Sequence, residues 1–264
     1  MSSVKEPGFF SNDERQPDWI TPVSAPKRIQ EWDAYCDLFR ESDSFPVRGE
    51  ASTGYLADAH AAARIKERLS GDEPRFVAVL RNPIDRAYSH YVYHRMLNVE
   101  PAPTFEAFLD DEPRRIHDNW NMQWRYRETG LYSRHLDTYQ NLFGADHLLV
   151  LLHEDFESPE QVFQKVARFL GVDEEWTVPV EGSVNESGVS RGAFASWILQ
   201  NRNPIKLLAR RMLPSRARKS LRGRLTDAPP ALASDTRSRL VDFYRDDVAA
   251  TEALLGRSLA HWLT

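Results

Sequence analysis

Arg81 and Ser89 lie eight positions apart in a stretch whose residue types suit the binding of a phosphate group. The guanidinium of Arg81 offers a planar set of donors that fits two phosphate oxygens. Ser89 offers a hydroxyl to the same group. The alternative is an ordinary amphipathic helix in which Arg81 pairs with a carboxylate. The tetrapeptide alone does not decide, because Arg202-Asn-Pro-Ile205 repeats it without a preceding strand and with Arg210 where a serine would be needed.

The elements around these two residues would place them at the end of a strand. Five apolar residues, Phe76–Leu80, predict a strand that is buried on both faces. Asn82 is a good N-cap and Pro83 suits the first helical position, so a helix is expected to begin there and to run to about Leu97. Free N–H groups and the helix dipole favour negative charge at such a junction. The sequence therefore predicts a phosphate site.

The full motif resembles the 3′-phosphate-binding motif of sulfotransferases that use 3′-phosphoadenosine 5′-phosphosulfate (PAPS). It reads Arg81-Asn-Pro-x-x-Arg86-Ala-x-Ser89-x-Tyr91. In that family the residues that match Arg81 and Ser89 hold the 3′-phosphate of the nucleotide. The resemblance points to the bacterial and heparan-sulfate-type branch. It implies one α/β domain over residues 1–264, with a parallel sheet flanked by helices as in P-loop NTPases.

A second candidate for chemistry lies close to the amino terminus. Residues 5–10 read Lys-Glu-Pro-Gly-Phe-Phe and resemble the family's Lys-Glu-x-His-Phe-Phe segment. In the heparan-type branch the glutamate that matches Glu6 is the proposed general base, which would take the proton from an acceptor hydroxyl. The alternative is a solvated glutamate on a fraying terminus. Gly8 stands where the family often has histidine, so no imidazole contribution is expected there.

The family's loop for the 5′-phosphosulfate, of the type Lys-x-Gly-Thr-Thr, is absent from the sequence. Glycine is scarce, with 12 residues, and no Gly-x-x-x-x-Gly-Lys pattern occurs. That loop neutralises the leaving phosphate, so its loss would remove transition-state stabilisation. Two explanations compete. Either Met1 is a misplaced start or truncation that omits about 25–40 residues, the size of one βα unit, or the chain is complete and catalytically weak or inactive. The intact remainder of the motif set favours the first.

Two further loops resemble parts of the family's cleft. Residues 182–192 resemble a late loop in which a basic residue folds over the nucleotide. Arg191 is the candidate for that residue, with a solvated loop arginine as the alternative. Residues 44–56 resemble the strand and Gly-Glu-x-Ser-Pro-x-Tyr loop on the acceptor side. Thr53 replaces the proline there. Ala51 stands where some carbohydrate-specific members carry lysine, which weakens the case for a polyanionic glycan.

Histidines and aromatic residues outside these motifs are weaker candidates. His90 and His94 have a spacing that can bind zinc, but no glutamate lies between them and no third ligand is evident. We therefore expect them on the helix surface and expect no metal. Residues 100–129 are interpreted as an irregular aromatic segment, either a lid over the acceptor or packing onto the core. Residues 130–136 resemble the family's Gly-x-Tyr-x-x-His/x-Leu helix, where His135 as a base is the alternative to a structural role.

The bulk composition narrows the class of protein. With 28% charged and 41% hydrophobic residues in 264, the chain is typical of globular proteins. The net charge of −5 and a pI near 5.9 argue against a general nucleic-acid binder. Cys36 is the single cysteine, so it is expected to be a half-buried structural residue in a reducing compartment. We find no apolar run of about 18 residues and no signal peptide, so a cytoplasmic location is expected.

The remaining elements follow from periodicity and caps. A strand is expected over residues 147–152, and Ser158 and Gln161 are expected to form a capping box for the helix that ends at Gly171. Other helices are expected over residues 28–40, 58–69 and 234–256. Residues 202–224 carry nine Lys and Arg and no acid. This basic segment is interpreted as a solvated face that attracts an anionic nucleotide, with contact to an acidic membrane surface or to an anionic acceptor as the alternatives.

The expected function is therefore transfer of a sulfuryl group from PAPS to a hydroxyl of a carbohydrate, lipid or small-molecule acceptor. Arg81, Ser89 and Arg191 would bind the nucleotide, and Glu6 would act as the base. The alternative is a module that binds PAPS or its product, adenosine 3′,5′-bisphosphate (PAP), without transferring the sulfuryl group.

Overall fold

The structure is a computed structural model in which part of the chain is described. The described residues are 1–11, 20, 29–42, 44–174, 189–190, 226–227 and 230–264. Arg191 and the basic segment 202–224 lie outside these residues, so the expectations for them remain predictions.

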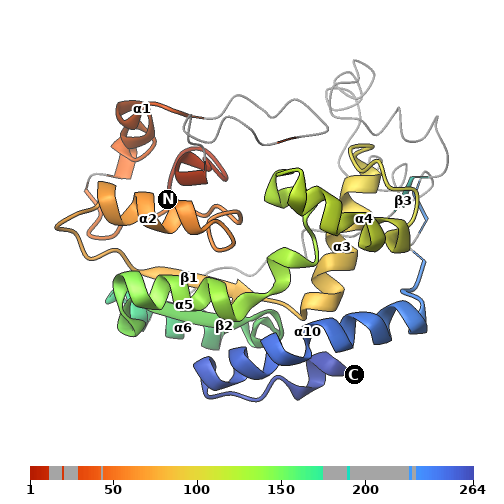
Figure 1. Cartoon of the computed structure of the whole chain (residues 1–264). Coiled ribbons are helices and arrows are strands. Elements are labelled where there is room, and N and C mark those ends of the chain that lie inside the picture. The colour runs from red at the N-terminus through yellow and green to blue at the C-terminus, as the bar shows by residue number, and fades with distance from the viewer. Residues whose placement is uncertain (12–19, 21–28, 43, 175–188, 191–225, 228–229) are drawn as a thin grey trace.

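The two apolar runs that predict strands form a sheet of two parallel strands. Strand β1 (Phe76–Leu80) pairs along its whole length with β2 (Leu148–Leu152), from Phe76 opposite Leu148 to Leu80 opposite Leu152. The chain between them passes through three α-helices and three short 3₁₀ helices, which is the long crossover that parallel pairing requires. Figure 1 shows the two strands below α2 and beside α5.

The expectation that β1 is buried on both faces is wrong. Ala78 and Leu80 are buried in the main core, whereas Val77 and Val79 are 40% and 50% exposed. Successive side chains of a strand point to opposite faces. The helices that bury Ala78 and Leu80 therefore leave the alternate face of β1 uncovered in the described part of the chain.

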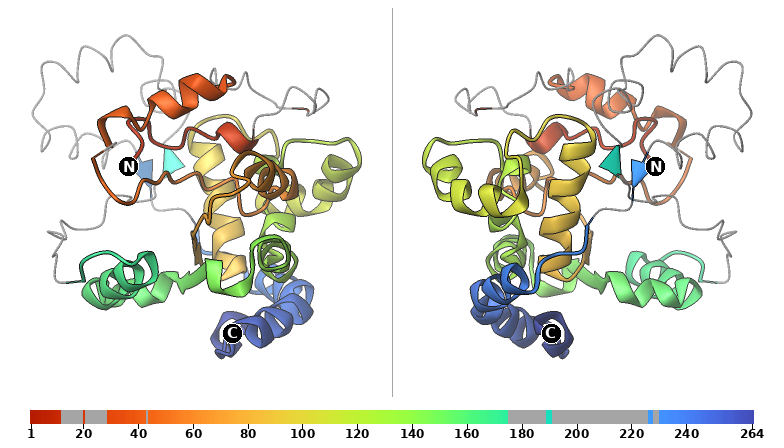
Figure 2. Two further views of the ribbon diagram at one scale, coloured as in Figure 1. Left: turned by 90° about the vertical axis from the view of Figure 1, so that its left-hand side faces the viewer. Right: turned by 90° about the vertical axis from the view of Figure 1, so that its right-hand side faces the viewer.

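Helices cover the sheet and build most of the core. Helices α5 and α6 lie on opposite sides of the sheet (Figure 2), and α10 packs against α5 and α3 and lies beneath α5 in Figure 1. The longer helices are α2 (Ala59–Arg68), α3 (Pro83–Met96), α4 (Phe105–His117), α5 (Tyr132–Phe143), α6 (Pro159–Leu170) and α10 (Ser234–Leu255). Shorter elements are α1 (Trp32–Asp37), η1 (Phe9–Ser11), η2 (Arg40–Ser42), η3 (Met122–Trp124), η4 (Glu128–Gly130), η5 (Ala145–His147), η6 (His153–Glu157), η7 (Ala260–Leu263), and the antiparallel pair β3 (Val189–Ser190) and β4 (Thr226–Asp227).

Two apolar clusters hold these elements together. The main cluster joins β1 and β2 to the inner faces of α3, α4, α5 and α10, and its largest members include Phe108, Tyr126, Leu136, Tyr244 and Trp262. The second cluster packs the amino-terminal segment against α1 and α2 and contains Phe9, Phe10, Tyr35, Ala61 and Ile65. None of the helices in the described residues is long and apolar enough to cross a bilayer.

The structure corrects several details of the expected elements. Residues 100–129 contain helix α4, and Phe105, Phe108 and Tyr126 are buried in the core. The structure therefore supports the interpretation that this segment packs onto the core, not the interpretation as a lid. Cys36 is exposed, not half-buried. Ser158 precedes α6 without a side-chain cap, so the expected capping box is absent. Gly171 does end α6 in the left-handed region, with φ 71°.

Candidate functional site

The junction between β1 and α3 is capped from within the chain. The Asn82 carboxamide oxygen accepts hydrogen bonds from the backbone N–H groups of Ile84 at 3.0 Å and Asp85 at 3.4 Å. Pro83 has no N–H to offer. The first-turn donors of α3 are therefore occupied, and the expectation of free N–H groups for an anion is wrong here. A phosphate at this junction depends on side chains, with only the helix dipole added.

Arg81 lies at this junction and Ser89 lies further along α3, and among the described residues the side-chain donors of both are unoccupied. Arg81 is exposed at the end of β1, and Ser89 is half-buried on α3. Neither side chain has a hydrogen bond or ion pair with the described residues. The backbone of Arg81 is fixed, because its carbonyl accepts a 2.8 Å hydrogen bond from the Tyr132 hydroxyl. The carboxylate partner that the alternative required for Arg81 is thus not found among the described residues.

The carboxy-terminal segment fixes the start of α3. The Asn82 side-chain amide donates to the Trp262 carbonyl at 3.1 Å. Trp262 is itself buried, and its indole N–H donates to Glu154 Oε1 at 3.0 Å. The His261 Nε2 also lies 2.7 Å from this carboxylate oxygen. Glu154 follows β2, so the region after β2 is tied to the start of α3 through one residue, Trp262, by its indole N–H on one side and its carbonyl on the other.

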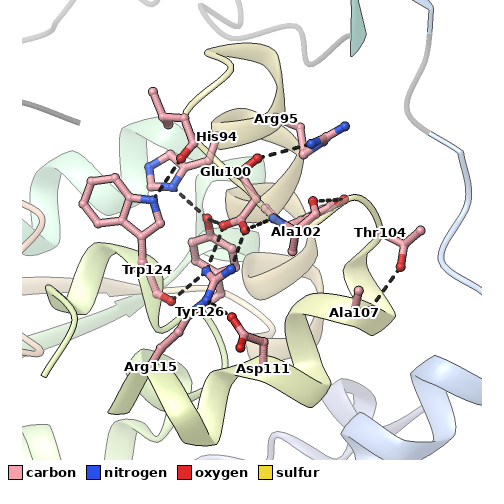
Figure 3. Close-up of polar contacts among 12 residues, drawn as sticks. His94, Arg95, Glu100, Ala102, Thr104, Ala107, Asp111, Arg115, Trp124 and Tyr126 are labelled. Atoms are coloured by element: carbon pink, nitrogen blue, oxygen red, sulfur yellow. Dashed lines mark hydrogen bonds and ion pairs between the residues drawn. The ribbon is translucent and has the colours of Figure 1, made fainter. Parts of the chain in front are cut away.

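A buried polar network fixes the other end of α3 (Figure 3). Arg115 of α4 makes two hydrogen bonds to the Glu100 carboxylate, at 2.6 and 3.0 Å, with both side chains fully buried. The Tyr126 hydroxyl donates to the same carboxylate and lies 2.8 Å from Nδ1 of His94, near the end of α3. Asp111 accepts from Arg115 Nε at 2.8 Å. Bidentate geometry with every buried charge paired is the arrangement that offsets the cost of desolvation.

The pKa values in this network follow from burial and pairing. Burial would raise the pKa of Glu100, but the hydrogen bonds from Arg115 and Tyr126 outweigh it and hold that pKa below its usual value. Burial lowers the pKa of His94 to about 4. Burial, together with the neighbouring Glu100 charge, raises the pKa of the Tyr126 hydroxyl. Glu100 is therefore charged and His94 neutral at pH 7, which suits a fixed support for α3.

Glu6 lies on the surface in a strained backbone conformation. Its side chain is exposed, and its φ of 51° is in the left-handed region that residues other than glycine rarely adopt. The Thr53 hydroxyl donates to Glu6 Oε2 at 3.2 Å. Phe9 and Phe10 are buried in the second cluster, so the segment is anchored and does not fray as the alternative assumed. A strained, anchored and exposed carboxylate fits a functional position.

Glu50 is a residue that sequence reasoning missed. Its carboxylate accepts hydrogen bonds from the hydroxyls of Tyr35, Ser52 and Tyr55. The signal in the sequence is an acidic residue followed closely by Ser52 and Tyr55, both of which carry hydroxyls. The sequence could not show that Tyr35, fifteen positions earlier, reaches the same carboxylate.

The histidines do not form a metal site in the described part of the chain. No group of three or more His, Cys, Asp or Glu side chains there could hold an ion. His90 and His94 pack against each other and against Tyr126, with ring centroids 4.5 Å apart for the histidine pair. His94 is only 6% exposed, so the expectation that both lie on the helix surface is wrong. The cause is α4 and the Tyr126 segment, which cover this face of α3.

His135 lines a cleft of about 340 Å³ between the start of α2, the segment around η3 and η4, and α5. The ring is buried, and its Nε2 has no hydrogen-bond partner in the described structure. Burial, with the Arg134 and Arg86 charges, lowers the pKa of His135 to about 4. Arg81, Ser89 and Glu6 do not line this cleft. His135 is therefore separate from the predicted nucleotide residues.

Arg191 itself lies outside the described residues, but the strand before it is placed. Strand β3 (Val189–Ser190) packs beside α3, the helix that carries Ser89. The chain thus passes α3 directly before Arg191. The nucleotide role of Arg191 stays a prediction.

Comparison with known proteins gives the family. Residues 56–187 match the family described as "Sulfotransferase domain". The bifunctional heparan sulfate N-deacetylase/N-sulfotransferase 1 of Xenopus laevis is 28% identical over 221 residues, which are 81% of this chain and 23% of the relative. The bifunctional heparan sulfate N-deacetylase/N-sulfotransferase 3 of Homo sapiens is 26% identical over 234 residues, which are 84% of this chain and 25% of the relative. The chain thus spans about a quarter of the length of these relatives.

A solved structure agrees with the sequence matches. The crystal structure of a sulfotransferase from Alicyclobacillus acidocaldarius superposes with a TM-score of 0.68 and 26% identity, covering all of this chain and 87% of the other. The expected α/β fold, a parallel sheet flanked by helices, is confirmed by this match and by the pairing of β1 with β2. The family profile matches half of the chain. The chain therefore belongs to the sulfotransferase domain family.

Proposed function

We propose that the protein transfers a sulfuryl group from PAPS to a carbohydrate acceptor. The proposal is carried by two side chains, Arg81 at the β1–α3 junction and Ser89 further along α3. Arg81 and Ser89 have no partner among the described residues, and Asn82 already caps the helix start. A guanidinium and a hydroxyl that are left free in this way suit the 3′-phosphate of the nucleotide. Arg191, which follows β3, is the proposed third contact.

The proposed reaction is an in-line displacement at sulfur. An acceptor hydroxyl or amine attacks the sulfur of PAPS, a new bond forms from that oxygen or nitrogen to sulfur, and the bond from sulfur to the 5′-phosphate oxygen breaks. Glu6 takes the proton that the acceptor loses, and PAP leaves with the electron pair of the broken bond. The exposed carboxylate of Glu6 is open to solvent for this proton transfer.

The acceptor class rests on the named relatives. Those proteins are N-sulfotransferases of heparan sulfate, which suggests a sugar hydroxyl or amine as the nucleophile here. Ala51, in the loop beside Glu6, has no charge with which to hold a polyanion. We therefore favour a carbohydrate of low charge over a heavily sulfated chain.

The test is calorimetry with PAP and three variants. Wild-type protein should bind PAP, and Arg81→Ala should weaken binding by about 10- to 100-fold, because a charge-assisted phosphate contact contributes roughly 1.5–3 kcal/mol. Ser89→Ala should weaken binding by about tenfold. Arg245→Ala is the matched control, since Arg245 is an exposed arginine of α10 paired with Asp242. No affinity in the wild-type protein would refute the proposal.

One observation favours a second function for these 264 residues taken alone. The sequence has no Gly-x-x-x-x-Gly-Lys pattern that could neutralise the 5′ end of the nucleotide. The function would then be binding of PAP without sulfuryl transfer. One measurement distinguishes this function from catalysis of the transfer. Incubation with PAPS labelled in its sulfuryl group and a panel of sugars gives labelled product only if the chain catalyses transfer.

A further inference from the structure

Glu50 sits at the centre of a hydroxyl cluster on the loop before α2. Its Oε1 accepts from the Tyr55 hydroxyl at 2.6 Å and from the Tyr35 hydroxyl at 3.1 Å, and its Oε2 accepts from the Ser52 hydroxyl at 2.6 Å. Both carboxylate oxygens are therefore occupied. Burial, with the Glu50 charge, raises the pKa of both tyrosines, so each hydroxyl keeps its proton and remains a donor.

Two of these hydroxyls also accept hydrogen bonds from the backbone of the segment that carries Glu6. Ser52 Oγ accepts a hydrogen bond from the Gly8 N–H at 3.0 Å, and the Tyr55 hydroxyl accepts from the Phe10 N–H at 3.2 Å. A hydroxyl has one proton, so a hydroxyl that donates to Glu50 presents its lone pairs to other donors. Hydrogen bonds in such a chain polarise and strengthen one another. The carboxylate thus sets the direction of both contacts.

The segment needs this support because its backbone is unfavourable. Glu6 has φ 51° and Gly8 has φ 60°. A non-glycine residue in the left-handed region persists only where its surroundings hold it. The same loop supplies Thr53, whose hydroxyl donates to Glu6 Oε2 at 3.2 Å. The loop therefore fixes both the backbone and the carboxylate of Glu6.

We propose that Glu50 is a positioning residue that holds the proposed base, Glu6, through the hydroxyls of Ser52 and Tyr55. The inference rests on the proposed function of Glu6. Glu50 is not itself the base, because hydrogen bonds from three hydroxyls occupy its two oxygens. Its effect on the reaction is expected through the placement of Glu6, with no effect on the nucleotide contacts of Arg81 and Ser89.

The first experiment measures the placement without requiring activity. Amide hydrogen exchange is followed by NMR at Gly8 and Phe10 in the full chain. Glu50→Gln should speed exchange at both amides by about tenfold, the effect of losing one hydrogen bond, and Ser52→Ala should act at Gly8 alone. Ser52→Thr keeps the hydroxyl and should restore protection. Glu41→Gln, at an exposed position nearby, is the matched control. Unchanged exchange in Glu50→Gln would overturn the proposal.

The second experiment separates positioning from general damage. Glu50→Gln should lower kcat for sulfuryl transfer by about 10- to 100-fold, as expected for a misplaced general base, and should leave PAP affinity within about twofold of wild type. A parallel loss of PAP affinity and of amide protection throughout the core would show general unfolding and overturn the proposal. If wild-type protein binds PAP but transfers nothing, the proposed function fails, and the exchange at Gly8 and Phe10 still decides whether Glu50 holds the segment.

Discussion

Two buried histidines differ in their hydrogen-bond partners but share a lowered pKa, because burial is the main cause in both. His94 Nδ1 lies 2.8 Å from the Tyr126 hydroxyl, whereas His135 Nε2 has no partner in the described structure. Both rings are more than nine-tenths buried, and burial lowers each pKa to about 4. The sequence did not indicate that either histidine is buried, because the residues that cover the two rings come from α4 and from the segment around η4. The sequence could identify His90 and His94 as a pair at helical spacing, but it could not identify the residues that pack over them.

The lowered pKa values predict a loss of stability in acid. Each unfolded imidazole takes up a proton near pH 6.5, whereas the folded one does so only near pH 4. The unfolded chain therefore binds more protons between these values, and the free energy of unfolding falls as the pH drops from 6.5 to 4. The loss is at most about 3 kcal/mol for each histidine. Urea titrations at several pH values measure it.

Substitution of His135 tests this assignment. His135→Leu has similar volume and removes the unpartnered nitrogen, so the free energy of unfolding at pH 7 should change by no more than about 1 kcal/mol. Between pH 6.5 and 4.5, the free energy of unfolding of His135→Leu should fall by about 2 kcal/mol less than that of the wild-type protein. His60→Leu, at an exposed position on α2, is the control for loss of an imidazole. An unaltered pH slope in His135→Leu would contradict the prediction.

At the scale of elements, the start of α3 was predictable and its consequence was not. Asn82 and Pro83 are local signals, and α3 begins where they place it. The sequence could not show that the Asn82 cap occupies the donors expected for the anion. Helix α4 was missed for a different reason. Pro113 lies inside it, and an internal proline removes a hydrogen bond, so the segment resembles a loop in the sequence.

Asn82 should link the stability of α3 to the proposed nucleotide binding. Asn82→Ala removes the cap and the contact with Trp262, so the free energy of unfolding should fall by about 1–2 kcal/mol. Asn82→Asp keeps the capping oxygen and should cost at most about 1 kcal/mol. It also places a carboxylate beside Arg81, which should weaken PAP binding by about five- to tenfold. Thermal unfolding and calorimetry distinguish the two effects. Equal PAP affinity in wild type and Asn82→Asp would argue against Arg81 as the phosphate contact.

At the scale of the molecule, contacts between distant parts of the chain complete the site. No side chain caps the start of α5 locally, and Asp247 of α10 accepts the Tyr132 N–H at 2.8 Å and the Ser133 N–H at 3.2 Å. Tyr132 in turn holds the Arg81 carbonyl. The two strands and the start of α3 could be predicted because their signals are local. These long-range supports could not, since nothing in the order of residues shows that Asp247 meets Tyr132.

Trp262 provides the corresponding test for the whole molecule. Trp262→Ala should lower the free energy of unfolding by about 3–5 kcal/mol, because it removes a fully buried indole. It should also weaken PAP binding, since without the buried indole the backbone carbonyl of residue 262 is no longer held in place to accept from Asn82. Trp262→Phe fills most of the volume and loses only the N–H donor to Glu154, so about 1–2 kcal/mol is expected. Chemical denaturation measures both. A similar loss in the two variants would show that packing contributes little at this position.

The contact between Asn82 and Trp262 spans 180 positions of the chain, and this separation has a consequence for biosynthesis. A ribosome that translates this message at about 5–20 residues per second makes Trp262 roughly 10–35 seconds after Asn82. During that interval the nascent polypeptide already displays Arg81 and Ser89, but the backbone that steadies them has not been made. Binding of the proposed nucleotide should therefore begin only once the segment around Trp262 has left the exit tunnel.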